Sequence, residues 1–349
     1  MKKEERIEIF VSEIWQWYAR HKRTLPWRDL TELDATQRAY LVFVSEIMLQ
    51  QTQVPRVEVV YRRFLREFPD LSALAKASDA QIIVAWRGMG YNSRALRLRD
   101  AARTIQKNFN GIFPSEMDNL LSIKGIGHYT AGAVRNFAFH LPTPCIDTNI
   151  RRILHRVFIG PENPDGTWVK HDAELLKLAE EVLAAALAPE NVSRFLFARC
   201  SLEPQNGQRK TNKRITVSQA QSFTADWHAA LMDFGSLVCT KNNPKWDQCP
   251  LTERGICKAA YKVQKVDKEK KKEPGRLVGS VFIPNRIFRG RIIEQLRDTS
   301  DGLTFVQIGK RITVDWDTAA HRQWLATVLE KLQKDRLVMQ NGQKYFLPH

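Results

Sequence analysis

Two carboxylates stand in surroundings that suit acid and electrostatic catalysis. The first, Glu46, lies in the nearly unbroken apolar run "LVFVSEIMLQQTQV", where a helix would place it against the core on most sides. A buried carboxyl holds a proton more readily than a solvated one, so Glu46 is a candidate general acid. A lone glutamate also fits the solvated face of an amphipathic helix, and that alternative stays open.

The second carboxylate is Asp147, in "PTPCIDTNIRRILHR", with Asn149 two positions further on. It follows an extended, proline-containing approach and precedes a basic helix, which is equally the setting of a simple N-cap. Glu46 and Asp147 together would supply an acid for a leaving base and an anion beside an oxocarbenium-like sugar. Those are the two tasks of glycosidic cleavage.

A glycine turn, "SIKGIGHYTAGAV", offers a binding function. Gly125 and Gly127 let the backbone turn tightly and expose N–H groups at the start of the following helix, where the helix dipole favours an anion. A DNA phosphate is the natural ligand of such a turn. The pattern is short, and an ordinary turn between two helices has the same residues.

The elements around these residues are predicted to be helical almost throughout, because apolar residues recur at three- and four-residue spacings. We therefore expect an all-α body in which the glycine turn joins two helices as a helix-hairpin-helix. Residues 201–222 are polar and basic and are interpreted as a mobile insertion. The charged run 262–278 indicates a linker to a module at 279–349, whose three expected helices and type I′ hairpin at Asn341-Gly342 suggest a winged helix.

The charge balance points to an anionic partner. The chain has 349 residues and a formal net charge of +16 at pH 7, superimposed on an ordinary globular composition. Nucleic acid is the favoured partner, ahead of an anionic membrane surface. No apolar run is long enough to span a bilayer, and the start has acids and tryptophan where a signal peptide needs apolar residues, so a cytoplasmic protein is expected.

These motifs resemble those of the helix-hairpin-helix DNA glycosylases of the MutY type. The resemblance covers about two-thirds of the chain in order, from "LPWR" through "SEIMLQQTQV", "GMGYNSRA", "IKGIGHYTAGAV" and "CIDTNIRRILHR" to "ALMDFGSLVCT". It implies a two-lobed body, with residues 1–30 and 135–261 as one helical lobe and residues 31–134 as the other. It also implies a monomeric, nucleoid-associated enzyme that extrudes a base from double-stranded DNA containing a mismatched or oxidised base and hydrolyses its glycosidic bond.

The same resemblance implies roles for single residues. Glu46 would protonate adenine N7 and position water, and Asp147, held by Asn149, would stabilise the cationic sugar. The residues that would contact DNA are Gln51 and Tyr91, which enter the duplex beside the opposite base, Thr52, which contacts that base, and Leu25, Trp27 and Arg28, which surround the flipped adenine.

Tyr129 occupies the position where the related endonuclease III branch has a Schiff-base lysine. A phenol cannot form that imine, so strand cleavage by β-elimination is expected to be absent. Tyrosine at this position fits adenine glycosylases and also thymine or uracil mismatch glycosylases. The identity of the excised base therefore stays open at this point.

The resemblance also implies an iron–sulfur cluster held by four cysteines, but this sequence departs from that pattern. The segment "CTKNNPKWDQCPLTERGIC" has Trp246 where the second cysteine is expected, leaving Cys239, Cys249 and Cys257. Cys200 could in principle supply a fourth ligand for a [4Fe-4S] cluster, but it precedes the insertion and nothing in the sequence brings it near. We expect a degenerate loop without a cluster, in which the cysteines are buried hydrophobic side chains.

Three further departures from the family pattern are present, and the first leaves the substrate specificity open. The C-terminal module does not resemble the Nudix-like module with which adenine glycosylases of this family recognise 8-oxoguanine. Lys124 replaces a common proline, and Asn92 stands where a second tyrosine is usual. Two alternatives follow: a thymine or uracil mismatch glycosylase, and a non-catalytic DNA-binding protein in which the winged helix dominates. The presence of both Glu46 and Asp147 argues against the second.

Overall fold

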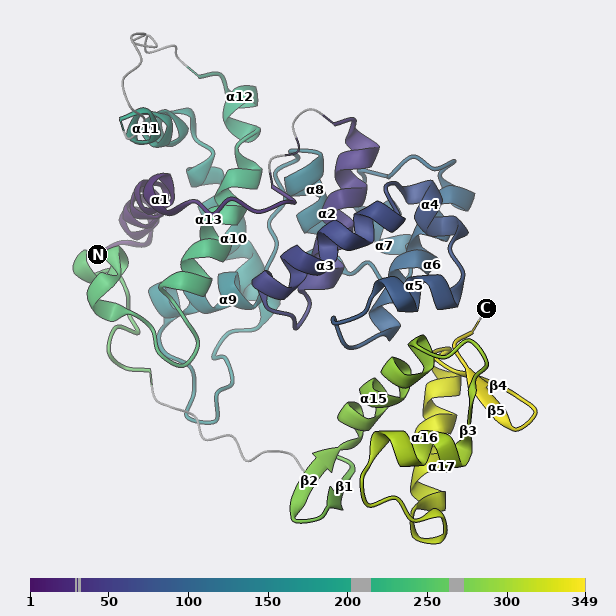
Figure 1. The fold of residues 1–349 in the computed structure, drawn as a ribbon. Coiled ribbons are helices and arrows are strands. Elements are labelled where there is room, and N and C mark those ends of the chain that lie inside the picture. The colour runs from purple at the N-terminus through teal and green to yellow at the C-terminus, as the bar shows by residue number, and fades with distance from the viewer. Residues whose placement is uncertain (29, 31–32, 202–214, 264–272, 349) are drawn as a thin grey trace. The chain divides into compact units, whose positions relative to one another are not determined.

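Helices make up most of the chain in the computed structural model, and among the described residues the few strands lie in the C-terminal part (Figure 1). The structure describes residues 1–28, 30, 33–201, 215–263 and 273–348. The predicted all-α body is confirmed. The described residues divide into two compact units: a first unit of residues 1–42, 115–121 and 126–268, and a second unit of residues 43–114, 122–125 and 269–349. The predicted lobe boundaries at residues 30 and 134 differ from these and stay a prediction.

The first unit is organised around the N-terminal helix. Its elements are α1 (Lys3–His21), the start of α2 (Ala35–Leu49), α7 (Met117–Ser122), α8 (His128–Ala138), α9 (Thr148–Leu154), the π-helical turn η1 (His155–Ile159), α10 (Asp172–Ala186), α11 (Pro189–Cys200), α12 (Val217–Gln221), α13 (Thr224–Leu237), the short 3₁₀ turn η2 (Trp246–Gln248) and α14 (Pro250–Glu253). Trp15 of α1 stacks on Phe195 of α11, with ring centroids 4.3 Å apart, and lies 5.1 Å from Trp227 of α13. This aromatic cluster excludes water from the unit's centre and so fixes α13, which carries part of the site described below.

The glycine turn has the predicted form, with one correction. It runs from the end of α7 at Ser122 to the start of α8 at His128, with Gly127 as the N-cap of α8. Gly125 has φ of 101°, a conformation that L side chains rarely adopt. Gly127 has φ of −99°, and a Cβ built there would meet no atom within 4 Å. The turn therefore requires glycine at position 125 only, and the expected steric need at position 127 was wrong.

The helical part of the second unit consists of the end of α2, α3 (Val54–Glu67), α4 (Leu71–Lys76), α5 (Asp79–Ala85) and α6 (Ser93–Asn108). Trp86, just beyond α5, is fully buried and packs edge-on against Phe64 of α3, with centroids 5.8 Å apart. Ser78 and Gln81 form a capping box at the start of α5. The short helices are thus held by caps and by packing, because helices of six or seven residues are marginal alone.

The C-terminal module belongs to the second unit and has the element order of a winged helix. After the hairpin β1 (Gly275–Val278) and β2 (Val281–Pro284) come α15 (Asn285–Arg297), β3 (Leu303–Thr304), α16 (Phe305–Ile312), α17 (Thr318–Lys334), β4 (Met339–Asn341) and β5 (Lys344–Phe346). Strands β3, β5 and β4 form an antiparallel sheet in that order. The three predicted helices and the hairpin are therefore present.

The turn of that hairpin differs from the prediction. Asn341 pairs with Lys344, so the two central residues are Gly342 and Gln343 instead of Asn341 and Gly342. Gly342 has φ of 58°, and neither Asn341 nor Gln343 has positive φ. A type I′ turn needs positive φ at both central positions, so the predicted turn type was wrong, and glycine at the first central position fits the type II′ alternative.

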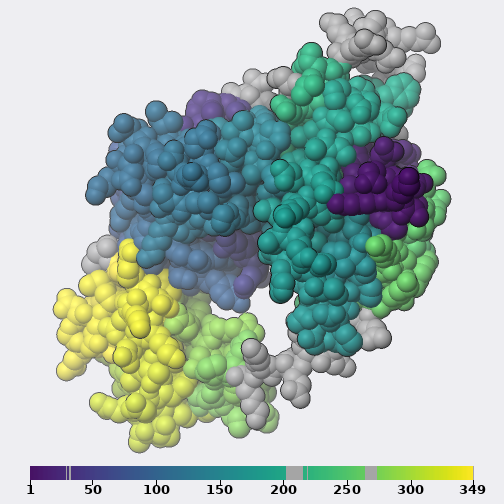
Figure 2. Space-filling view, turned by 180° about the vertical axis from the view of Figure 1, so that it is seen from behind, coloured from purple at the N-terminus to yellow at the C-terminus, as the bar shows by residue number. Residues whose placement is uncertain are grey.

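The module lies against the helical part of its own unit, as Figure 2 shows for the yellow C-terminal segment beneath the blue helices. Arg87, which follows α5, pairs with Glu294 of α15 at 3.3 Å and with Asp298. The expected linker at 262–278 is partly ordered structure, because β1 begins at Gly275. Residues 264–272 lie outside the described residues.

Most of the expected insertion, at positions 202–214, also lies outside the described residues. Its end is α12, whose N-cap Thr216 forms a capping box with Gln219. No helix was predicted in this polar run, although Thr216 and Gln219 fit the S/T-x-x-E/Q signature of a helix start. The expected mobility of the insertion stays a prediction. Across the part of the chain that the structure describes, no helix combines the length and apolar character needed to cross a membrane.

Candidate active site

Asp147 is the N-cap of α9 and is held by two neighbours. The Ile150 backbone N–H donates to Oδ1 at 2.6 Å, and Asn149 Nδ2 donates to Oδ2 at 2.8 Å. Burial raises the pKa of the Asp147 carboxyl above its usual range, while these two hydrogen bonds and the charge of Arg152 act in the opposite direction. The predicted contact between Asp147 and Asn149 is present, together with the predicted cap.

A close approach of two helices keeps this group in place. A Cβ built on Gly235 of α13 would lie 2.6 Å from Asn149 Cβ, so only glycine lets α13 come this near to α9. Arg152 donates from Nη2 to Asn149 Oδ1 and to the Gly235 carbonyl, both at 2.6 Å. Asn149 is therefore fixed from both sides, and the Asp147 carboxylate has one defined orientation.

The "LPWR" motif, residues 25–28, is also bound to α13. Leu25 and Trp27 are buried, and Arg28 forms two hydrogen bonds with Asp233, at 2.7 and 2.8 Å. Desolvation is the largest effect on Asp233 and acts to raise the pKa, yet its hydrogen bond and ion pair with Arg28 leave the pKa below the usual range. The buried pair holds the motif on the helix that also carries Gly235.

Glu46 is on the last turns of α2 and has an exposed fraction of 6%. The buried position matches the expectation and excludes the alternative of a solvated helix face. Glu46 belongs to the second unit and Asp147 to the first. The catalytic roles of both residues stay predictions.

Gln51 and Tyr91 occupy two tight turns in which both residues have positive φ, 56° and 45° respectively. Non-glycine residues rarely adopt this conformation, and such strain often marks functional positions. Tyr91 has an exposed fraction of 54%, so its ring is accessible. Both residues therefore lie on strained turns, and their roles as DNA contacts stay predictions.

Arg94 joins the two turns from inside the second unit. Its guanidinium donates to the carbonyls of Ile47 at 3.0 Å and Met48 at 3.1 Å on one side, and to that of Met89 at 3.2 Å on the other. It also donates to Thr52 Oγ1 at 3.1 Å. Burial lowers the pKa of Arg94 to about 10. The sequence did not predict a role for Arg94 within "GMGYNSRA". Its partners are backbone carbonyls, and no sequence pattern distinguishes one carbonyl from another.

A cavity of about 740 Å³ lies in the second unit beside these turns. Gln51, Thr52 and Tyr91 line one side, and Arg286 and Arg289 of α15 line another. Three of the predicted DNA contacts thus border one hollow with basic residues, which suits a polyanionic ligand.

Tyr129, the remaining predicted site residue, is the second residue of α8 and is half-buried. Its backbone N–H belongs to the first turn of the helix, where donors lack partners within the helix. The glycine turn and Tyr129 therefore lie together at the start of α8.

Comparison with known proteins identifies the family. Residues 44–180 match the model of the HhH-GPD superfamily of base excision DNA repair proteins. The chain is 30% identical over 296 residues to the adenine DNA glycosylase of Mycolicibacterium smegmatis, a match that covers 85% of this chain and 83% of the relative. It is 33% identical over 262 residues to the adenine DNA glycosylase of Mus musculus, covering 74% of this chain.

The chain belongs to the MutY-type branch of the HhH-GPD superfamily.

Two solved structures share this fold. A thermostable thymine-DNA glycosylase superposes with a TM-score of 0.55 at 23% identity, covering 74% of this chain and 98% of that one. An endonuclease III in a covalent complex with DNA superposes with a TM-score of 0.51 at 17% identity, covering 75% and 99%. The chain spans only 43% of the length of the mouse relative.

The four-thiolate cluster of MutY-type proteins does not fit the residues of this loop. Cys239 and Cys249 are buried, and burial raises the pKa of the Cys257 thiol to about 12. Trp246 takes the place of the missing ligand, and the guanidinium carbon of Arg156 lies over its ring, 5.9 Å from the ring centroid. Among the described residues, no group of three or more His, Cys, Asp or Glu side chains is arranged to hold a metal ion.

Arg156 holds the cysteine loop by other means. Its side chain is fully buried and donates to the carbonyls of Thr240 at 2.7 Å and Lys241 at 2.9 Å, and it pairs with Glu162 at 2.6 Å. Its Nη1 also lies 3.7 Å from Cys239 Sγ. Hydrogen bonds from one buried guanidinium thus order the backbone of this loop.

Proposed function

We propose that this MutY-type chain is a monofunctional DNA glycosylase that hydrolyses the N-glycosidic bond of adenine opposite guanine or 8-oxoguanine. The Asp147 carboxylate, oriented by Asn149 and the Ile150 amide, carries the proposal, because an anion fixed beside a sugar stabilises positive charge that develops in the transition state. The names of the relatives, adenine DNA glycosylases, support adenine as the base.

In the proposed reaction, Glu46 donates a proton to adenine N7 and the bond between C1′ and N9 breaks. Asp147 stabilises the oxocarbenium-like sugar. The water that the Glu46 carboxylate positions then adds to C1′ and gives its proton to that carboxylate. Adenine leaves neutral and the products are free adenine and an abasic site. The reaction needs no redox step.

Tyr129 supports a hydrolytic enzyme without strand cleavage. A β-elimination that starts from an imine needs a primary amine, and the phenol of Tyr129 offers none. The position of Tyr129 on the first turn of α8 suits a contact to DNA beside the glycine turn. The expected product is therefore an intact strand carrying an abasic site.

The proposed partner is double-stranded DNA with a mismatched or oxidised base, bound by a monomer in the cytoplasm at the nucleoid. The net charge of +16 supports a polyanionic partner. Leu25, Trp27 and Arg28 would surround the extruded adenine, and Gln51, Thr52 and Tyr91 would contact the duplex. The three-cysteine loop supports an enzyme that folds without an iron–sulfur cluster.

A single-turnover panel of duplexes tests the function. Adenine, thymine or uracil is placed opposite guanine, 8-oxoguanine or cytosine, and abasic sites are revealed by alkaline cleavage. We expect release of adenine opposite 8-oxoguanine or guanine, and a loss of about 10²- to 10⁴-fold in rate for Glu46→Gln and for Asp147→Asn. Release of thymine or uracil with adenine untouched would establish the mismatch alternative.

Asp70→Asn is the matched control for Asp147→Asn. Asp70 is likewise the N-cap of a helix, α4, and accepts from the Ala73 N–H at 2.8 Å. Because asparagine is also a good N-cap, both substitutions keep the cap, and only that at Asp147 is expected to change the rate. If adenine is released and both catalytic substitutions are silent, the proposed mechanism is wrong. An unaltered chain that binds DNA and releases no base would establish the non-catalytic alternative.

A further inference from the structure

Asn92, which stands where MutY-type sequences usually have a second tyrosine, is bound by the C-terminal module. Its Oδ1 accepts a hydrogen bond from Nη2 of Arg297, the last residue of α15, at 2.9 Å. Arg297 also donates to the Ile83 carbonyl, from Nη2 at 2.8 Å and from Nε at 3.1 Å. Its side chain is 1% exposed, and burial lowers its pKa to about 10. A buried guanidinium thus reaches from the module to the turn that carries Tyr91.

The side chain of Asn92 is committed to this contact. Asn92 is the N-cap residue of α6, a position where asparagine usually accepts from a backbone N–H of the first turn. Here it makes no such bond, and its φ and ψ of −57° and −23° are helical. The amide oxygen serves Arg297 instead, so the residue links two parts of the second unit.

The turn that carries Tyr91 is strained, so it depends on contacts from other parts of the second unit. Gly88, Gly90 and Tyr91 have positive φ. Trp86 Nε1 donates to the Gly90 carbonyl at 3.2 Å, and Arg94 donates to the carbonyls of Met89 and Gly90. These contacts come from the helical part of the unit, whereas the contact at Asn92 comes from the module. An exposed aromatic residue in a strained conformation keeps one position only when its neighbours fix it.

We propose that Arg297 is a positioning residue that acts through Asn92 on the turn of Tyr91, so that the C-terminal module prepares this turn for insertion into DNA. The inference rests on the proposed function, in which Tyr91 enters the duplex. Pre-ordering the turn lowers the entropic cost of binding, because the bound conformation already exists in the free protein. The module also lines the adjoining cavity with Arg286 and Arg289 of α15.

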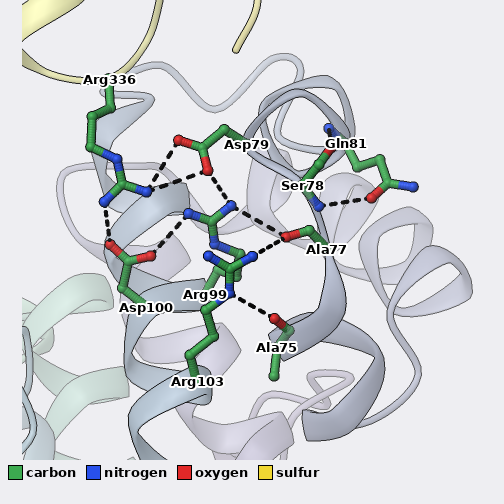
Figure 3. Close-up of polar contacts among 9 residues, drawn as sticks. All are labelled: Ala75, Ala77, Ser78, Asp79, Gln81, Arg99, Asp100, Arg103 and Arg336. Atoms are coloured by element: carbon green, nitrogen blue, oxygen red, sulfur yellow. Dashed lines mark hydrogen bonds and ion pairs between the residues drawn. The ribbon is translucent and has the colours of Figure 1, made fainter. Parts of the chain in front are cut away.

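A second attachment of the module supplies the control. Arg336, beyond α17, donates to Asp100 Oδ2 at 2.9 Å and to Asp79 Oδ2 at 3.1 Å (Figure 3). Arg99, which is fully buried, pairs with the same two carboxylates, as the dashed lines in Figure 3 show. Asp79 begins α5 and Asp100 lies inside α6, so this contact fastens the module without a bond to the Tyr91 turn.

Hydrogen exchange of the free full-length chain tests the coupling directly. The variants are Arg297→Ala, Asn92→Ala, the double variant, Arg297→Lys and the control Arg336→Ala. We expect the backbone amides of residues 88–95 to exchange roughly 10-fold faster in Arg297→Ala and in Asn92→Ala, because a hydrogen bond to a charged group is lost. The double variant is expected to match the single ones, Arg297→Lys to recover part of the protection, and Arg336→Ala to leave these amides unchanged.

A duplex with 2-aminopurine beside the mispair provides the functional measurement. Its fluorescence rises when a side chain unstacks the base, and we expect a smaller rise for Arg297→Ala and Asn92→Ala than for the unaltered chain or for Arg336→Ala. Additive effects of the two substitutions, or equal losses in Arg336→Ala, would overturn the proposal. If Arg297→Ala fails to fold, Asn92→Ala alone decides it.

Different results would contradict the proposed function and the proposed positioning role of Arg297. If the unaltered chain releases no base, or if Tyr91→Ala unstacks 2-aminopurine as well as the unaltered chain does, the proposed function or the role of Tyr91 is wrong. The exchange of residues 88–95 still shows in that case whether Arg297 orders the turn. Unchanged exchange in both Arg297→Ala and Asn92→Ala would overturn the positioning role even if adenine is released.

Discussion

Asn149 donates from Nδ2 to Asp147 Oδ2 at 2.8 Å, while its Oδ1 accepts from Arg152 Nη2 at 2.6 Å. The arginine can only donate and the carboxylate oxygen can only accept, so the orientation of the Asn149 amide is determined. A carboxylate held this way presents its charge in one direction.

Asn149→Ala should lower the single-turnover rate of adenine release by about 10- to 100-fold, because it removes a hydrogen bond to a charged group that orients Asp147. Asn149→Asp should lower it further, since a second carboxylate would face Asp147 and repel it. DNA affinity measured alongside should change little. A full rate in Asn149→Ala would show that the Ile150 amide orients Asp147 without help.

The stability contribution of Asp147 should depend on pH in the sense opposite to that of most carboxylates. Folding raises its pKa, so the ionised form is disfavoured in the fold, and its contribution becomes more favourable as the pH falls from neutral. The free energy of unfolding of the unaltered chain, relative to Asp147→Asn, should therefore increase between pH 7 and about pH 4. Urea titrations at several pH values measure this difference, and a decrease over that range would contradict the assignment.

His228 should make the first unit sensitive to acid. It is buried in α13, its Nδ1 lies 2.8 Å from the Thr224 carbonyl, and desolvation lowers its pKa to about 4. Its stabilising contribution is present above the unfolded pKa of about 6.5 and is lost as the pH falls toward the folded value, by at most about 3 kcal/mol. The free energy of unfolding should fall less steeply below pH 6.5 in His228→Asn. Equal slopes in the two proteins would show that protonation of His228 does not limit stability.

The two glycines of the hairpin should respond differently to substitution. Gly125→Ala should destabilise the chain by about 1 kcal/mol, because alanine is strained at φ of 101°. Gly127→Val should leave the melting temperature nearly unchanged, since a Cβ there meets no atom within 4 Å. It should nevertheless weaken binding to all duplexes alike if a phosphate approaches the start of α8, because phosphate contacts carry no sequence information. A changed base preference at full affinity would exclude a phosphate contact at this turn.

Protein purified without oxygen should contain no stoichiometric iron or sulfide and should lack the visible absorption of an iron–sulfur cluster. The reason is that Trp246 offers no ligand where a fourth thiolate is needed. Arg156→Ala should destabilise the protein, because it removes the donors to Thr240 and Lys241 that order the loop. Iron and sulfide that disappear in Cys239→Ser would prove that the loop does assemble a cluster.

The sequence alone was sufficient to identify the helical body, the winged-helix module and the family, because helix periodicity and ordered motifs are local properties. It also indicated the contact between Asp147 and Asn149, since the two residues are separated by only one position. The three helices of the C-terminal module and its terminal hairpin were predicted for the same reason, whereas the short strand β3 was not. The exact turn of the hairpin at Gly342 was not predicted correctly, because a shift of one residue in strand pairing changes which two residues lie at the centre of the turn.

Only the tertiary structure shows which buried arginines bind and orient the backbone around the candidate site. Arg94 binds the Ile47 carbonyl, 47 positions away, and Arg297 binds the Ile83 carbonyl, 214 positions away. A carbonyl acceptor is present at every residue, so no sequence pattern distinguishes the ones used. Asp233, in "ALMDFG", is an acid within an apolar helix, and the same feature marked Glu46 as a candidate. The sequence did not reveal the role of Asp233, because its partner Arg28 is 205 positions away. Types of residue and local spacing can be read from a sequence, whereas the pairing of buried charges depends on which helices pack together.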